Sequence, residues 1–159
     1  MKKIIIPFLI LLIIILILFF VFTMKKRVNI KNIQHLRFSY TSGYAMYAYT
    51  IYEIDYKDGK YFLTTKPDGV PDEDKQTEEI KKEDIKAIEN ILNKYSVCFW
   101  DGFNKTDKNV LDGNSFSFTL TFDNNNEIHS YGYMMYPKNY REVKEELINI
   151  FIKYYKDKE

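Results

Sequence analysis

The chain has 159 residues, of which 46% are hydrophobic and 28% are charged, and its formal net charge is +1. The last 132 residues hold all 22 acidic side chains and 18 basic ones, a net charge of −4, and an acidic segment without a basic stripe is a poor nucleic-acid binder. The single cysteine, Cys98, excludes an intrachain disulfide and gives no cysteine-based zinc cluster.

An apolar run of 19 residues, Ile4 to Phe22, begins the chain, and Thr23 and Met24 extend it. At 1.5 Å per residue the run is long enough to cross a hydrocarbon core of about 30 Å. Basic residues flank it on both sides, and neither a small-residue cleavage site nor a lipobox cysteine follows it. The predicted segments are a basic tail (1–3), an uncleaved transmembrane signal-anchor helix (4–24), a tether (25–33) and a single domain (34–159).

The charges around this run favour opposite orientations. More lysine and arginine follow the run than precede it, which by the positive-inside rule favours a cytoplasmic domain and a role as an inward-facing partner of a membrane complex. A short basic tail directly before an apolar run is instead typical of a signal, which leaves the tail inside. We expect the second arrangement, a single-pass protein of the cell membrane with an extracytoplasmic domain.

The pattern after the anchor is that of strands. His35 to Thr41 alternates, Tyr44 to Tyr56 is a long β-prone run, and Tyr61 to Thr65 follows it. Asp58-Gly59 predicts a hairpin between the last two, because this pair readily adopts the positive φ angles of a tight turn. Pro67 to Gln76 is predicted to be a polar loop.

The second half of the chain contains two predicted helices and two more predicted strands. Isoleucines recur at helical spacing over residues 83–95, which predicts an amphipathic helix. Ser115 to Asp123 alternates apolar side chains with Ser and Thr, and Glu127 to Met135 follows an asparagine turn. Asn139 and Glu142 resemble a capping box that begins the last helix.

The predicted order is therefore strand, strand, strand, helix, strand, strand, helix. Every connection between strands, except the one that contains the first helix, is a short hairpin, which favours antiparallel pairing. We expect an α+β domain in which two helices cover one face of an antiparallel sheet of about five strands, preceded by one transmembrane helix.

Catalytic and metal-binding motifs are weak in this sequence. Asp101, Asp107 and Asp112 lie close together, but two of them directly precede glycine, where aspartate serves a turn. The same stretch resembles a calcium loop with the wrong spacing and no bidentate glutamate. His35 and His129 lie in different predicted strands, without a nucleophile in a recognisable context. We therefore predict no catalytic residue, no metal site and no cofactor.

Surplus aromatic side chains are the remaining functional signal. Tyr131 and Tyr133 share one side of their predicted strand, and if helices cover only one face of the sheet, part of the aromatic set meets solvent or a partner. Ordinary cross-strand aromatic pairing is the alternative. The candidate ligand-binding residues are Trp100, Asp101, Asp112, Tyr131 and Tyr133.

Several short stretches occur together between Trp100 and Tyr140: W-D-G-F, V-L-D-G, an F-x-F strand, G-Y and P-K-N-Y. In this pattern the chain resembles an uncharacterised family of small membrane-anchored proteins and lipoproteins of clostridia and related low-GC Gram-positive bacteria. The resemblance extends from about Leu36 to Tyr154 and implies an extracytoplasmic, membrane-tethered domain, with no activity to carry over. The chain departs from the lipoproteins because it has no lipobox cysteine, so the helix would be its anchor.

Together these features predict a non-catalytic binding or interaction module of the cell envelope. The N-terminal helix would contact the membrane, and an envelope protein, a peptide or a glycan would be the partner. The alternative is a small cell-envelope enzyme or enzyme inhibitor that uses the loop from Trp100 to Asp112.

Overall fold

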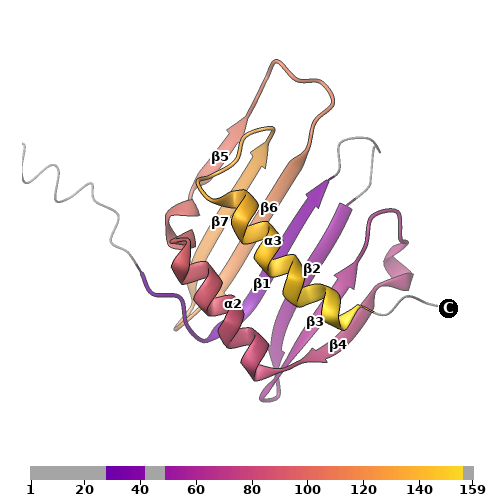
Figure 1. Ribbon diagram of the computed structural model, residues 1–159, viewed down its shortest axis with the longest axis vertical. Helices are drawn as coiled ribbons and strands as arrows, with labels where there is room; N and C mark the ends of the chain where they lie inside the picture. Colours follow the sequence, from indigo (N-terminus) through magenta and orange to yellow (C-terminus); the bar gives the residue numbers. More distant parts are fainter. Residues whose placement is uncertain (1–27, 42–48, 156–159) are drawn as a thin grey trace, which may run out of the picture.

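The computed structural model describes residues 28–41 and 49–155, which form a mostly-sheet fold. Seven strands of this part of the chain make one mixed sheet in the order β4-β3-β2-β1-β6-β7-β5, and two α-helices lie across one of its faces (Figure 1). The elements are β1 (Ile33–Thr41), β2 (Tyr49–Lys57), β3 (Lys60–Lys66), η1 (Asp72–Asp74), β4 (Gln76–Ile80), α2 (Lys82–Lys94), η2 (Val97–Trp100), β5 (Phe103–Thr106), β6 (Ser115–Phe122), β7 (Asn126–Tyr133), α3 (Tyr140–Phe151) and η3 (Ile152–Tyr154).

The prediction of an antiparallel sheet of about five strands is wrong. β4 pairs with β3, and β5 pairs in parallel with β7, so the described sheet has seven strands and is mixed. Both additional strands lie at the edges of the sheet, and most of their side chains are exposed or half-buried. They therefore lack the apolar alternation by which a strand is predicted from sequence.

The predicted transmembrane helix at residues 4–24 lies outside the described residues, as do Tyr44 and Tyr47 of the β-prone run. Within residues 28–41 and 49–155, no helix has the length and the hydropathy needed to cross a membrane.

The chain is packed against α2 before β1 begins. The side chain of Asn93 accepts a hydrogen bond from the backbone N–H of Ile30 at 2.8 Å and donates one to the carbonyl of Ile30 at 2.7 Å. Ile30 is fully buried. The last residues of the predicted tether are thus part of the packed domain.

The hydrophobic core fills the space between the sheet and the two helices. β6 alternates as its sequence predicts, and β1 contributes Leu36 and Phe38 from the neighbouring position in the sheet. The buried side chains of β6 and the two helices are Phe116, Phe118, Leu120, Phe122, Ile85, Ile88, Ile91, Leu92, Val143, Leu147, Ile150 and Phe151. Burial of these apolar side chains is the main favourable term in folding.

Two small residues on the covered face of β7 have different reasons to be small. A Cβ at Gly132 would overlap the carbonyl oxygen of Met135 and the ring of Phe116, so the backbone approach requires glycine. Ser130, two residues earlier, has a buried hydroxyl that finds no hydrogen-bond partner among the described residues. The first residue is required by packing, whereas the second carries an unsatisfied polar group.

We expect Gly132→Ala to lower the free energy of unfolding by about 1–3 kcal/mol, because the added methyl must displace backbone. Ser130→Ala is the matched change on the same face, and it should raise the free energy by up to about 1 kcal/mol, because it removes the unsatisfied hydroxyl. Urea unfolding of the full chain in detergent micelles, followed by circular dichroism, measures both values. A Gly132→Ala variant as stable as the wild type would contradict the close approach.

Candidate functional site

The five predicted ligand-binding residues lie on different sides of the sheet. Tyr131 and Tyr133 lie on the face opposite the helices, because they alternate with the buried Ser130 and Gly132. Trp100 lies on the covered face. The five residues therefore do not converge on one site.

Trp100 is a core residue that also fixes a surface segment. Its side chain is 2% exposed and packs edge-on against the ring of Phe118, with 5.4 Å between the centroids. Its Nε1–H donates a hydrogen bond to the carbonyl oxygen of Lys138 at 3.0 Å. The indole thus connects η2 to the segment that precedes α3.

Asp101 and Gly102 form the turn that follows Trp100. Gly102 has a φ of +74° and donates its N–H to the carbonyl of His129 at 2.9 Å. The N–H of His129 in turn donates to Oδ1 of Asp101 at 3.4 Å. The carboxylate of Asp101 is therefore engaged with the backbone of β7.

Asp112 lies in the loop between β5 and β6, which extends beyond the end of the sheet (Figure 1). The backbone of this loop is held at several points. The N–H of Asp107 donates to the carbonyl of Tyr133 at 2.9 Å, and the N–H of Asn109 donates to Oδ1 of Asp107 at 2.9 Å. The hydroxyl of Tyr133 donates to the carbonyl of Leu111 at 2.8 Å. The predicted residues Asp112 and Tyr133 are thus neighbours.

The side chain of Leu111 is 94% exposed even though its backbone is fixed, and it is one of several exposed apolar side chains in this region. Among the described residues, ten large hydrophobic side chains are exposed, and half of them lie on this loop or at the end of β7. We call this surface the apolar end. Its members are Leu111, Tyr131, Met134, Met135 and Tyr136.

Short contacts join the loop to the segment after β7. The N–H of Met134 donates to the carbonyl of Asn114 at 2.9 Å, and the N–H of Asn114 donates to Sδ of Met134 at 3.2 Å. Gly113 has no room for a Cβ, which would overlap the side chain of Met134. Met134 has a positive φ of 55°, a strained value for this residue type, so the surrounding contacts impose its conformation.

A groove of about 480 Å³ adjoins the apolar end and shares Tyr136 with it. Trp100, Phe99 and Phe103 contribute aromatic surface to its lining, and Lys105 supplies a cation. The groove lies where η2, the start of β5 and the segment before α3 meet.

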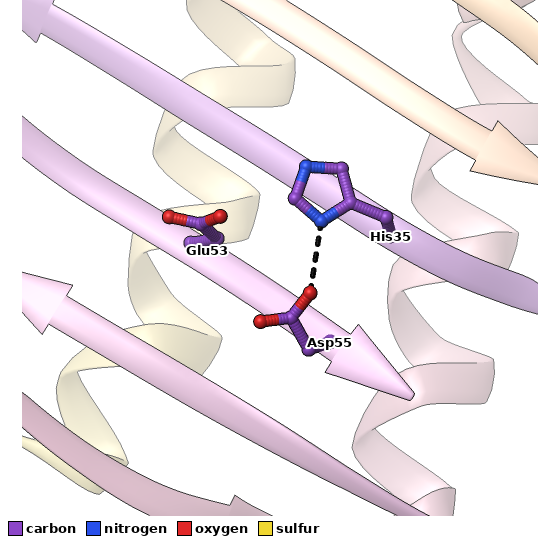
Figure 2. A group of neighbouring side chains, drawn as sticks. All are labelled: His35, Glu53 and Asp55. Carbon is purple, nitrogen blue, oxygen red and sulfur yellow. Dashed lines mark hydrogen bonds and ion pairs between the residues drawn. The ribbon is translucent and has the colours of Figure 1, made fainter. Parts of the chain in front are cut away.

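A polar cluster lies on the opposite side of the domain from this groove. Figure 2 shows His35, Glu53 and Asp55 on the face of the sheet that is turned away from the helices. One possible ligand atom of each lies within 4.8 Å of the other two, and imidazole and carboxylate groups can hold a zinc ion. However, Glu53 is paired with Arg37 at 3.0 Å, and Asp55 with Lys57 at 3.2 Å.

The charge pairs of this cluster connect β1 to β2. Nδ1 of His35 lies 3.1 Å from Oδ1 of Asp55, its direct cross-strand partner. Burial raises the pKa of the Asp55 carboxyl, but hydrogen bonds from His35 and Lys57 outweigh burial and hold that pKa below its ordinary value. We assign the cluster a structural role, since its carboxylates already have cationic partners on the sheet.

Comparisons with known proteins assign no family. No model of a known protein family matches the chain, and no curated protein matches it. The family resemblance therefore stays a prediction, and the function must be argued from the geometry.

We expect Tyr133→Phe to release the β5–β6 loop, because the variant loses the hydroxyl that holds the Leu111 carbonyl. Amide hydrogen exchange over residues 108–113 should rise by up to about tenfold, the equivalent of one ordinary hydrogen bond. Tyr131→Phe is the matched control on the same face of β7 and should leave exchange in the loop unchanged. Equal exchange in both variants would show that the hydroxyl does not hold the loop.

Proposed function

We propose that the chain is a non-catalytic binding module of the cell envelope, anchored in the membrane by its N-terminal helix with the domain outside. The observation that carries the binding role is the apolar end, where exposed side chains gather on an ordered loop and at the end of β7. Several exposed large apolar side chains in one region of a domain are typical of an interaction site. The anchor is supported by the apolar run Ile4 to Phe22, and the outward orientation by the short basic tail directly before that run.

The composition of the apolar end favours a protein partner. Tyrosine and methionine are enriched at protein interfaces, and methionine adapts to irregular surfaces. A glycan would instead favour flat aromatic rings bordered by polar groups. Leu111 has the most exposed side chain of the apolar end. We therefore expect it to enter an apolar pocket on the partner, with Met134 and Tyr136 packing around it.

The contacts of the nucleophilic and basic side chains favour binding over catalysis. The sulfur of Cys98 lies 3.9 Å from the carbonyl of Ser96, in its own turn. His129 pairs with Glu127 at 3.0 Å, and both side chains are largely exposed. Neither contact forms the dyad of nucleophile and base that covalent catalysis requires.

An enzyme inhibitor is the second candidate, and the geometry of Leu111 supports it. A rigid loop that holds one apolar side chain in solvent can insert that side chain into a substrate cleft, and it loses little conformational entropy on binding. In that case the partner would be a hydrolase of the envelope, and Leu111→Asp would abolish inhibition.

Cysteine labelling on intact cells tests both the orientation and the apolar end. In a Cys98→Ser background, we expect Asp112→Cys, next to Leu111, and Tyr56→Cys to react with a membrane-impermeant maleimide. Tyr56 is the matched control, since it is exposed beside the β2–β3 hairpin, at the other end of the sheet from the Leu111 loop (Figure 1). The labelling rate at position 112 is divided by the rate at position 56, both on cells and on the purified full chain. A docked partner should make this ratio several-fold lower on cells.

Two results would contradict the proposal. If neither cysteine reacts until the cells are opened, the domain faces the cytoplasm. If both react with the ratio of the purified protein, nothing covers the apolar end.

A further inference from the structure

The charged side chains that line the groove beside the apolar end all have the same sign, which is positive. Its only charged lining residues are Lys105 and Lys138, both of which are exposed, and no carboxylate contributes to the lining. Neither lysine forms an ion pair within the part of the chain that the structure describes, although the acidic residues of the domain outnumber its basic ones. The groove is thus a local cationic site on an acidic domain.

Aromatic side chains form the other part of the lining. Phe99 is 48% exposed and Tyr136 is 39% exposed, so both present ring surface to a ligand. Nζ of Lys105 lies 5.5 Å from the centroid of the Phe103 ring, a cation–π distance that places this charge beside the aromatic surface. A ligand that fits both features has a negative charge next to an apolar group.

Internal hydrogen bonds hold the groove in shape. The indole of Trp100 fixes the carbonyl of Lys138, and the side-chain amide of Asn139 donates to the carbonyl of Tyr95 at 3.4 Å. Gly102 bonds to β7 and so positions the start of β5, from which Lys105 projects. A preformed site binds with a smaller entropic cost than one that must be ordered by its ligand.

We infer that this groove binds an acidic segment of the partner protein, with carboxylates at Lys105 and Lys138 and an apolar side chain against Phe99 and Tyr136. The inference rests on the proposed binding role and specifies the chemistry of the partner. Charge complementarity selects an acidic segment, because the lining offers two cations and no anion. The shared residue Tyr136 makes the groove continuous with the apolar end, so one partner would cover both.

Trp100 provides the measurement, because it lines the groove and is the only tryptophan of the chain. The full chain in detergent micelles is titrated with a blocked five-residue peptide that has phenylalanine between two glutamates. The matched probe has glutamine in place of both glutamates. We expect a saturable change in tryptophan emission with the acidic peptide and up to about tenfold weaker binding of the neutral one, the effect of losing two exposed ion pairs.

Variants of the lysines locate the site. The double variant Lys105→Gln, Lys138→Gln should bind the acidic peptide about tenfold more weakly. Its matched control is Lys31→Gln, Lys108→Gln, which removes two exposed lysines outside the lining and should bind like the wild type. Equal affinity for both peptides, or equal affinity of the two double variants, would overturn the inference.

A lipid headgroup is the competing anion, and nanodiscs distinguish it. Tryptophan emission of the full chain is compared between phosphatidylglycerol and phosphatidylcholine nanodiscs. If the emission differs, if this difference depends on Lys105 and Lys138, and if the peptide has no effect, then the groove binds lipid. The inference fails in that case. Leu111→Asp separates this test from the proposed function: it should leave peptide affinity unchanged while it abolishes docking at the apolar end. A variant that no longer docks in cells but still binds the peptide therefore bears only on the role of the apolar end and not on the inference about the groove.

Discussion

The contact between Trp100 and the segment before α3 holds together the end of the domain that contains the groove and the apolar end. The indole is buried against the β6 rings on one side, and its N–H holds the carbonyl of Lys138 on the other. Tyr140, at the start of α3, packs on the ring of Phe116 with 4.6 Å between the centroids, and Tyr136 stacks on Tyr140 at the same distance. Exposed rings of the groove and of the apolar end are thus continuous with the core.

Two regions of the domain differ in what they leave for a partner. On β1 and β2, the face without helices carries cross-strand pairs of polar side chains, His35 with Asp55 and Arg37 with Glu53. These pairs bring modest stability and offer little apolar surface. Exposed apolar groups concentrate instead where the β5–β6 loop meets the end of β7. The proposed binding role of that end rests on this contrast more than on any single residue.

Prediction from the sequence succeeded where a pattern is local. The alternation of β6, the Asp58-Gly59 hairpin with its positive φ angles and the isoleucine face of α2 all follow from neighbouring residues. β4 and β5 were missed because an edge strand is defined by its partner strand and not by its own apolar residues. Asn139 does precede α3, but its side chain bonds to the carbonyl of Tyr95 and makes no capping hydrogen bond.

The candidate site was predictable only in part for the same reason. Tyr131 and Tyr133 follow from strand alternation, and the V-L-D-G stretch places two apolar residues in a polar loop. The exposure of Leu111 and of the segment Met134 to Tyr136 depends on tertiary contacts that periodicity does not contain. An apolar run that ends at Pro137, beyond the last strand position, is the signal that could have indicated this surface.

Trp100 holds the segment before α3, and with it the groove, in a fixed shape. Hydrogen exchange on the full-chain variant Trp100→Phe tests it most directly, because phenylalanine keeps an aromatic ring in the core but cannot donate a hydrogen bond to the Lys138 carbonyl. The smaller ring also leaves a cavity that lowers protection throughout the domain. We predict an additional rise in exchange over residues 136–141, by up to about tenfold relative to the strands, for the one lost hydrogen bond. Unchanged exchange over this segment, or an even rise across the whole domain, would contradict the account.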